Sequence, residues 1–186
     1  MEERRQEEHE LMEQEALEWN EALREETGWE QEKREDSSFG GKNGQGKLYL
    51  CSTPIGNLDD ITLRVLDTLK RVDLIAAEDT RHSIKLLNHF HIKTPMTSYH
   101  EYNKVEKAYD LINKLQAGKN IALITDAGTP AISDPGEVLV KMCQEAGITV
   151  TSLPGPAACI TALTLSGLST RRFCFEGFLP FDDKKE

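Results

Sequence analysis

Three segments rich in small and turn-forming residues carry the chemistry that this sequence suggests most strongly. They span residues 52–62 (STPIGNLDDIT), 126–136 (DAGTPAISDPG) and 153–158 (LPGPAA). Small residues let the backbone approach a ligand closely, and a carboxylate such as that of Asp126 can accept hydrogen bonds from an amine or a ribose hydroxyl. Together the three segments predict a site for a nucleoside-type ligand.

Each segment also has an ordinary structural explanation. In the first, Pro54 and Gly56 would shape a tight turn, and Asp59 or Asp60 would cap the helix that follows. In the third, Pro156 would simply start a helix. The second segment has eleven residues, whereas a loop that only joins a strand to a helix usually has about two to six. The second segment is therefore the most specific of the three.

Two polar clusters, at residues 78–82 (EDTRH) and 98–103 (SYHEYN), are expected to follow two further strands. Their side chains could position a substrate and take a proton from it, and the candidates for these catalytic roles are Asp79, Arg81 and His100. The first cluster could equally cap a helix, and Arg81 could contact phosphate or only solvent. A structural explanation therefore stays open beside the catalytic one.

Other ligand classes lack their motifs. No GxGxxG follows the first expected strand, and neither GxxxxGK[ST] nor GxSxG occurs, which argues against a dinucleotide site, a P-loop and an α/β-hydrolase. The four cysteines are scattered, with no CxxC pair and no histidines at ligand spacing. Neither a metal site nor a disulfide framework is expected.

The elements that must position these segments follow from the hydrophobic pattern of residues 47–170. Short apolar runs alternate there with amphipathic stretches in the order βαβαβαβαβα. This order predicts an α/β fold with a mainly parallel five-stranded sheet and helices on both faces. Residues 74–77 and 121–124 are apolar without alternation, as strands buried on both faces should be. Because ligands bind at the carboxyl ends of parallel strands, the three segments should meet at one edge of the sheet.

Acidic charge is concentrated at the N-terminus. Residues 1–36 hold 15 of the 32 acidic and 5 of the 22 basic side chains, so the rest of the chain holds 17 of each. RNA binding by this neutral body would need a local basic surface or a partner domain. Residues 1–46 are interpreted as an acidic tail, helical or disordered with disorder favoured, and a glycine-rich flexible linker. A helical tail would place four residues on one stripe facing the body or a partner helix: Met12, Ala16, Trp19 and Leu23.

The pattern changes after Gly167. Residues 171–186 begin with RRFCFEGFLP and are interpreted as the first strand of a truncated second domain, or as a tail that packs back on the first domain. No apolar run reaches the roughly 18 residues of a membrane span, and the N-terminus lacks the apolar core of a signal peptide. A cytoplasmic protein without a membrane partner is expected.

Six blocks occur in an order that resembles the RsmI branch of the tetrapyrrole methylase superfamily: TPIGNLDDITLR, AAEDTRH, SYHEYN, ITDAGTPAISDPG, LPGPAA and FEGFLP. The resemblance covers residues 46–180. It implies a two-domain α/β fold in which S-adenosyl-L-methionine lies in the cleft between the domains, with residues 47–170 as the cofactor-binding domain. It also implies an rRNA-processing enzyme that methylates the 2′-hydroxyl of a cytidine in small-subunit ribosomal RNA, with that RNA or the assembled small subunit as its partner.

The resemblance also implies which residues bind the cofactor. The first segment contributes Thr53, Pro54, Gly56 and Asn57 to the cleft. The second contributes contacts to the methionyl and ribose portions from Asp126, Ala127, Gly128, Ala131 and Ile132. The third borders the adenine with Ala157 and Ala158. The superfamily often has Gly-Asp where this chain has Gly56-Asn57, which favours the RNA-modifying branch over tetrapyrrole substrates.

Several questions stay open at this point. The family pattern offers no agreed catalytic base, so Asp79, Arg81 and His100 are candidates by position and chemistry alone. The activity could instead be a tetrapyrrole or protein methyltransferase, or the chain could be a non-catalytic interaction module. We expect this chain to fold around its sheet but to bind the cofactor weakly and not to turn over. The oligomeric state is open, with a homodimer as one option.

Overall fold

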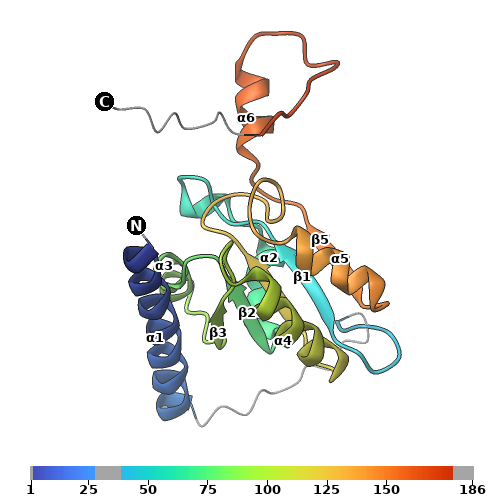
Figure 1. Ribbon diagram of the computed structural model, residues 1–186. Helices are drawn as coiled ribbons and strands as arrows, with labels where there is room; N and C mark the ends of the chain where they lie inside the picture. The colour runs from blue at the N-terminus through green and yellow to red at the C-terminus, as the bar shows by residue number, and fades with distance from the viewer. Residues whose placement is uncertain (1, 28–38, 178–186) are drawn as a thin grey trace.

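The computed structural model describes residues 2–27 and 39–177 (Figure 1). Its α-helices are α1 (Glu2–Thr27), α2 (Leu63–Arg71), α3 (Thr80–His89), α4 (Lys104–Gln116), α5 (Glu137–Glu145) and α6 (Ala158–Leu165), and a 3-10 helix is η1 (Leu58–Asp60). Its strands are β1 (Lys47–Cys51), β2 (Leu74–Ala77), β3 (Met96–Ser98), β4 (Ile121–Ile124) and β5 (Thr149–Leu153). The alternation predicted for residues 47–170 is confirmed.

The five strands form one sheet in the order β3-β2-β4-β1-β5, and every neighbouring pair is parallel. The central strand β4 pairs with β1 on one side and β2 on the other, and all four of its residues are buried. A strand covered on both faces has no polar face, which is why residues 121–124 are continuously apolar. The predicted five-stranded parallel sheet is therefore present.

Helices cover both faces of the sheet, as predicted. Val65 and Leu69 of α2 pack with Leu87 of α3 in one buried cluster. Leu111 of α4 and Leu139 of α5 pack in a second cluster. Two separate apolar clusters are the expected result when amphipathic helices alternate with strands of a parallel sheet.

Local hydrogen bonds set where the helices begin. The Thr62 side chain accepts from the Val65 N–H at 3.2 Å and caps α2, while Asn57 caps η1. The expectation that Asp59 or Asp60 would cap the helix is wrong, because both lie in η1 itself. A hydroxyl just before the first turn of α2 satisfies one of the free N–H groups there.

The acidic N-terminus is helical over α1 and packs on the body, where disorder was the favoured interpretation. Ala16 and Leu23 of the predicted stripe are buried. Figure 1 shows α1 alongside α3 and β3, at the edge of the sheet. The tail is ordered because apolar residues at helical spacing and several polar side chains find partners in the body.

The two flanking segments also differ from expectation. Residues 39–46 of the predicted flexible linker lie against the body, where the Gly46 N–H donates to the Leu115 carbonyl at 2.7 Å. Residues 171–177 form no strand. The rest of both predicted segments lies outside the described residues. Helix α6 has no buried residue and extends away from the sheet in Figure 1.

Over the residues described, no helix is both long and apolar enough to cross a membrane.

Substitution of the fully buried Leu111 by alanine should lower the free energy of unfolding by about 2–5 kcal/mol, because it leaves a cavity between α4 and the sheet. Val105→Ala on the exposed face of the same helix should cost less than about 0.5 kcal/mol. Urea unfolding followed by circular dichroism measures both. Equal losses for the two variants would contradict the assignment of the core.

Candidate functional site

The first and second segments are joined directly at the carboxyl edge of the sheet. The Thr53 N–H donates to the Gly128 carbonyl at 2.9 Å, and the Gly128 N–H donates back to the Thr53 carbonyl at 3.0 Å. The Thr53 hydroxyl also donates to the Thr125 carbonyl at 3.0 Å. Because β1 and β4 are parallel neighbours, both loops leave the sheet at the same level and can exchange these bonds.

The third segment closes on the other two. The Thr129 hydroxyl donates to the Pro156 carbonyl at 3.0 Å, and the Ser52 hydroxyl donates to the Leu153 carbonyl at 3.3 Å. A Cβ atom on Gly155 would lie 2.6 Å from the Cβ of Ser52, so only glycine allows this close approach. The predicted meeting of the three segments is thus present in the structure.

The second segment holds an unusual backbone. Ala131 and Ser133 have φ angles of 66° and 61°, and Gly128 and Gly136 have φ angles of 88° and 149°. Left-handed conformations at residues other than glycine cost roughly 1–3 kcal/mol each and occur mainly where a fixed backbone shape serves a ligand site. The strain supports the interpretation of this loop as more than a connection.

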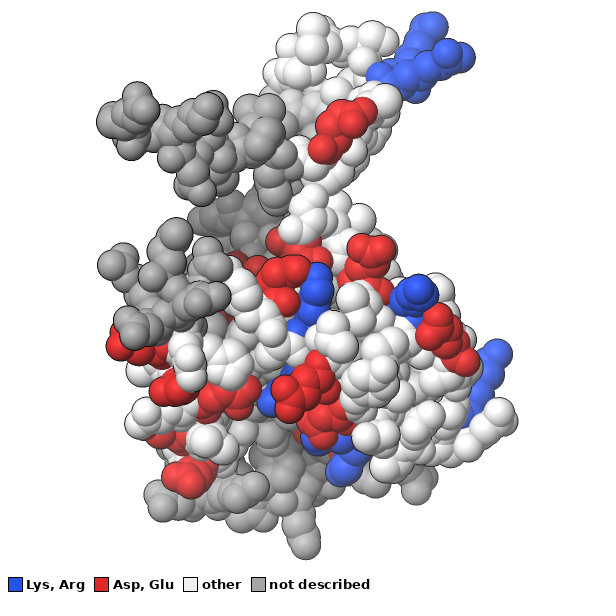
Figure 2. All heavy atoms as spheres, in the orientation of Figure 1, with Lys and Arg blue, Asp and Glu red and all other residues white. Residues whose placement is uncertain are grey.

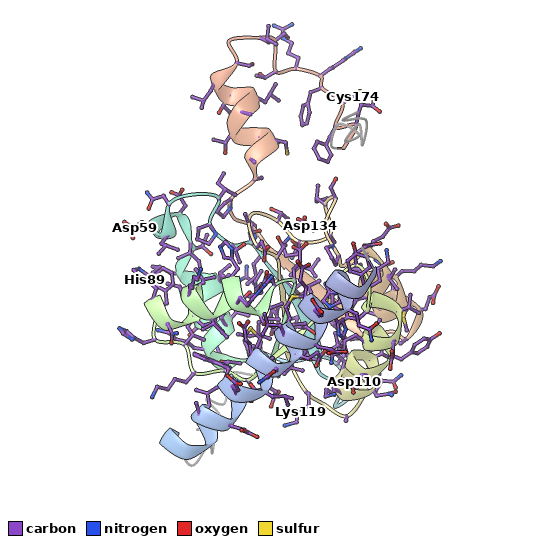
Figure 3. The ribbon with its side chains drawn as sticks, turned by 60° about the vertical axis from the view of Figure 1, so that its left-hand side comes forward. Asp59, His89, Asp110, Lys119, Asp134 and Cys174 are labelled. Atoms are coloured by element: carbon purple, nitrogen blue, oxygen red, sulfur yellow. The ribbon has the colours of Figure 1, made fainter. Side chains whose placement is uncertain are left out.

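A hollow of 350 Å³ borders the second segment, and its lining includes Thr129, Ala131, Ile132 and Ser152. Ile132 is 52% exposed and could cover a ligand there. In Figure 3, Asp134 of the same loop lies at the edge that faces the C-terminal segment with Cys174. Small side chains and an exposed apolar side chain are suited to a nucleoside.

The predicted cofactor residues differ in their surroundings. Thr53, Pro54 and Gly128 are buried in the joined loops. Ala127, Ala158, Gly56 and Asn57 are exposed, and the Asn57 side chain is engaged as the cap of η1. Ala157 lies half-buried directly before α6, and no side chain of its own caps that helix. The buried members can shape the site, and the exposed members can contact a ligand.

Three carboxyl groups lie close together where β2 and β4 end. The Asp126 N–H donates to Oε2 of Glu78 at 3.4 Å. Burial, followed by the charges of Asp126 and Asp134, raises the pKa of Glu78 to about 7. Burial also raises the pKa of Asp126 and of Asp134. Oδ1 of Asp126 is buried and has no hydrogen-bond partner within the described part of the chain, so a bound hydroxyl or amine could satisfy it.

Two of the predicted catalytic residues hold each other. Asp79 accepts from the Arg81 guanidinium at 2.6 and 3.0 Å, and it also caps α3 through the Arg81 and His82 N–H groups. Burial raises the pKa of Asp79, but the hydrogen bonds from Arg81 outweigh burial and leave the pKa below its ordinary value. A carboxylate held in this way is a weak base, and the capping explanation of the first polar cluster is present in the structure.

His100, the third candidate, lies under helix α1. Its side chain is 5% exposed, and its ring packs edge-on against His9 at 4.8 Å between centroids. Nδ1 accepts from the Tyr102 N–H at 3.3 Å, whereas Nε2 has no partner among residues 2–27 and 39–177. Burial and the neighbouring His9 lower the pKa of His100. The imidazole is therefore neutral at physiological pH and shielded from solvent.

Glu78 is the residue that the sequence argument passed over. Its carboxyl group stands between the loop after β4 and the polar cluster, and its pKa of about 7 suits proton transfer near neutral pH. The sequence signal was present, since Glu78 precedes Asp79 in the same cluster. The sequence does not show, however, which of these two carboxyl groups is available for proton transfer, because this depends on the contact of Asp79 with Arg81.

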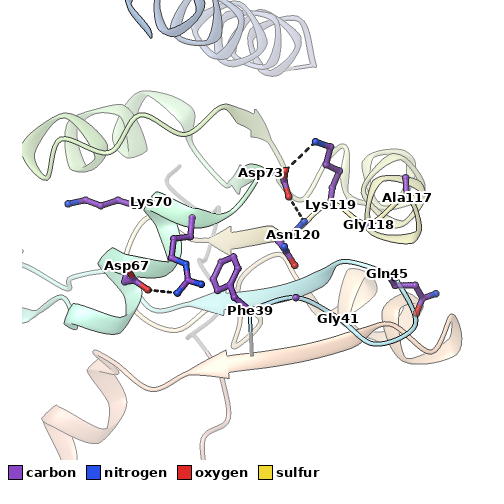
Figure 4. A pocket seen from close by; sticks show the side chains of 13 residues that line it. Phe39, Gly41, Gln45, Asp67, Lys70, Asp73, Ala117, Gly118, Lys119 and Asn120 are labelled. Carbon is purple, nitrogen blue, oxygen red and sulfur yellow. Dashed lines mark hydrogen bonds and ion pairs between the residues drawn. The ribbon is translucent and has the colours of Figure 1, made fainter. Parts of the chain in front are cut away.

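A larger cavity lies at the opposite end of the sheet. It has a volume of 730 Å³, and most of its lining comes from the segments before β1 and β4 (Figure 4). The lining residues are 39–41, 44, 45, 67, 70, 71, 73 and 117–120. Arg71 stacks on Phe39 at 4.0 Å, and Lys119 pairs with Asp73 at 3.2 Å. In parallel sheets, ligands bind at the carboxyl ends of the strands, so we place the functional site at the joined loops and not here.

Comparison with known proteins finds related sequences. Residues 47–177 match the sequence model of a family described as tetrapyrrole (corrin/porphyrin) methylases. The chain is 61% identical over 139 residues to ribosomal RNA small subunit methyltransferase I of Haemophilus influenzae, covering 75% of this chain and 49% of the relative. It is 51% identical over 153 residues to the protein of the same name in Bacillus subtilis, covering 82% of this chain and 52% of the relative. The chain spans about half the length of these curated relatives.

Solved structures show the same fold. A diphthine synthase has a TM-score of 0.57 at 15% identity, covering 69% of this chain and 52% of that protein. Uroporphyrin-III-C-methyltransferase from Thermus thermophilus has a TM-score of 0.52 at 21% identity, covering 69% of this chain and 55% of that protein. Both likenesses support the predicted α/β architecture.

The raised pKa of Glu78 should make stability depend on pH. The folded state holds this proton up to about pH 7, whereas the unfolded state releases it near the ordinary value of 4.5. The contribution of Glu78 is therefore full below pH 4.5 and is lost as pH rises through 7. Glu78→Gln cannot ionise and should be more stable than the wild type by about 1–2 kcal/mol near pH 8, after allowance for solvent screening.

Urea unfolding between about pH 4 and pH 8 checks this expectation, with the two proteins converging at the acidic end. The exposed Glu145→Gln is the matched control and should leave the pH dependence of the wild type in place. A parallel pair of curves for wild type and Glu78→Gln would show that Glu78 ionises normally in the folded state.

Proposed function

Because this chain belongs to the family of tetrapyrrole (corrin/porphyrin) methylases, we propose that it supplies the S-adenosylmethionine-binding α/β domain of a methyltransferase that acts on small-subunit ribosomal RNA. Methylases of this family depend on S-adenosylmethionine. The observation that carries the proposal is the reciprocal hydrogen bonding of Thr53 and Gly128, which joins the loops after β1 and β4. It supports a single site built from segments that are far apart in the sequence.

The chemistry of the joined loops fits this methyl donor. The unpartnered Oδ1 of Asp126 can accept from a ribose hydroxyl or from the methionyl ammonium group. The strained backbone around Ala131 and the hollow beside Ile132 can take the flat and apolar parts of a nucleoside. We propose that Thr53, Gly128 and Ala157 shape the rest of the contact surface. When bound, the donor supplies an activated methyl group on sulfur, so the protein contributes mainly positioning.

A ribose hydroxyl is a weak nucleophile and benefits from a group that takes its proton as the new bond forms. We propose Glu78 for this role, since its pKa near 7 leaves it partly ionised and ready to accept a proton at neutral pH. Asp79, with its lowered pKa, then serves to hold Arg81 and the start of α3. His100 remains a candidate that requires α1 to move, because α1 covers it.

The substrate proposed is the 2′-hydroxyl of a cytidine in small-subunit ribosomal RNA, and the compartment proposed is the cytoplasm. The relatives at 51–61% identity carry names of small-subunit ribosomal RNA methyltransferases, which supports RNA over a tetrapyrrole or a protein as the acceptor. The Asn57 side chain caps η1 at the first loop, so its structural role does not depend on contact with a substrate. The number of subunits stays open.

A transfer assay tests the acceptor. A polypeptide that continues this chain over the full length of its curated relatives is incubated with unmodified small ribosomal subunits and methyl-labelled donor, and the RNA is digested to nucleosides. The proposal expects label in 2′-O-methylcytidine. Label in added uroporphyrinogen or in ribosomal protein, with none in RNA, would contradict it.

Donor binding by this chain alone should be weak and should depend on Asp126. Asp126→Asn replaces one carboxylate oxygen by an amide and should weaken binding about tenfold or more, since hydrogen bonds to charged groups contribute roughly 1.5–3 kcal/mol. Calorimetric titration with S-adenosylmethionine measures the affinity. Asp110→Asn makes the same change in the exposed ion pair with Lys114 and should leave the affinity unchanged. Equal effects of the two substitutions would remove Asp126 from the site.

A further inference from the structure

Helix α1 lies outside the residues that match the family model, yet it is built into the body of the protein. The Trp19 indole N–H donates to the Thr94 carbonyl at 3.1 Å, and Ala16 and Leu23 are buried. Figure 3, in which α1 comes forward, shows the helix lying across the body. Helix α1 therefore covers a part of the body surface that lies apart from the joined loops.

One contact of α1 is made to the edge of the sheet. The Asn20 side-chain amide donates to the Met96 carbonyl and accepts from the Met96 N–H, both at 2.8 Å. Met96 belongs to β3, whose outer edge has no neighbouring strand in the sheet. Asn20 thus replaces one residue of a pairing strand and closes an otherwise open edge. This contact fixes the position of α1 along β3.

A second contact of α1 places the carboxylate of Glu13 among hydrogen-bond donors of the body. Oε1 of Glu13 accepts from the Ser98 hydroxyl at 2.6 Å and from the Lys107 ammonium at 3.3 Å. At the preceding residue, the Met12 carbonyl accepts from the Thr80 hydroxyl at 2.9 Å. Burial raises the pKa of Glu13, but the bonds from Ser98 and Lys107 outweigh burial and lower it, so the group is charged. The acceptors of α1 occupy donors that come from three different elements.

The donors that α1 occupies, Thr80, Ser98 and Lys107, form one set with the neighbouring Arg81, which Asp79 holds and which is 39% exposed. These four residues are called here the donor surface. Hydroxyl, guanidinium and ammonium groups are the side chains that most often bind the phosphate and sugar groups of nucleic acids. All four lie within residues 47–177, and His100 lies beside them under His9. The body as a whole carries equal numbers of acidic and basic side chains, so RNA binding needs a local surface of this kind.

We propose that the donor surface binds the phosphate backbone of the RNA substrate, and that α1 occupies it in this structure as an intramolecular competitor whose Glu13 carboxylate takes the place of a phosphate. This inference rests on the proposed RNA-directed function. RNA then binds only when α1 leaves, and its departure also uncovers Nε2 of His100. The observed association constant for RNA equals that of the open form multiplied by the fraction of molecules that are open.

Charge supports this competition. Figure 2 shows acidic side chains gathered over the α1 side of the molecule, and the sequence of α1 has an excess of glutamates over basic residues. The charges of Glu15 and Glu8 reach Arg81 and, after the larger effect of Asp79, contribute to raising its pKa. An acidic cover both fills the donor surface and repels an approaching polyanion.

Glu13→Gln tests the inference in the full chain. It keeps the shape of the side chain but removes the charge that holds Lys107, so α1 should open more often and Lys107 should become available to phosphate. A fluorescein-labelled RNA hairpin, titrated by fluorescence anisotropy at fixed salt, should bind about three- to tenfold more tightly than to the wild type. Glu21→Gln removes one charge from the exposed face of the same helix and should change the affinity less than about twofold. Equal tightening by both variants would overturn the proposal, because it would reflect net charge alone.

A second variant weakens the docking of α1 without changing its charge. Trp19→Ala combined with Asn20→Ala removes the contacts to Thr94 and Met96. Because Asn20→Ala itself removes the acceptor of the Met96 N–H, hydrogen exchange is followed at the backbone amides of α1, which report whether the helix has left the body. RNA should then bind about tenfold or more tightly. Faster exchange of the α1 amides without tighter RNA binding would overturn the proposal. If this variant does not fold, as circular dichroism would show, the comparison of Glu13→Gln with Glu21→Gln decides.

The outcome of the RNA-binding test is independent of the binding of S-adenosylmethionine. RNA affinity that stays the same in Glu13→Gln, while calorimetry shows S-adenosylmethionine bound through Asp126, overturns the competition by α1 and leaves the proposed function in place. Tighter RNA binding in Glu13→Gln without any binding of S-adenosylmethionine supports the donor surface and contradicts the proposed cofactor.

Discussion

The site depends on one reciprocal pair of backbone hydrogen bonds, between Thr53 and Gly128. These bonds are available only because β1 and β4 are parallel neighbours, so their following loops leave the sheet side by side. Gly155 then allows the third loop to reach Ser52 at a distance that no larger residue permits. The sheet order therefore determines the site, and the small residues in the loops let the three backbones meet.

Charge at this edge is divided between two kinds of carboxyl group. Asp79 is fixed and ionised by Arg81, which gives α3 its start and keeps a cation in place. Glu78 and Asp126 lie beside one another, and burial raises the pKa of both, although the charges of His82 and Arg81 act in the opposite direction on Asp126. Groups with opposite pKa shifts in one site are the usual arrangement for separating a structural role from proton transfer.

The sequence predicts the sheet, the two helical faces and the meeting of three loops, because each follows from local periodicity and from the geometry of parallel strands. It does not predict the docking of α1, which depends on contacts such as Asn20 with Met96, made between residues far apart in the chain. The sequence does not distinguish Asp79 from Glu78 as a base for the same reason, since only the folded structure shows the contact of Arg81 with Asp79 and that of Asp126 with Glu78. Burial and pairing are properties of the fold and leave no mark in a local pattern.

Backbone amide chemical shifts during titration with S-adenosylmethionine report where on this chain the methyl donor binds. We expect the largest changes on the amides of Gly56, Gly128 and Ala157, at the carboxyl edge of the sheet. Changes confined to Gly41, Gly118 and their neighbours, around the larger cavity at the opposite end, would contradict this expectation.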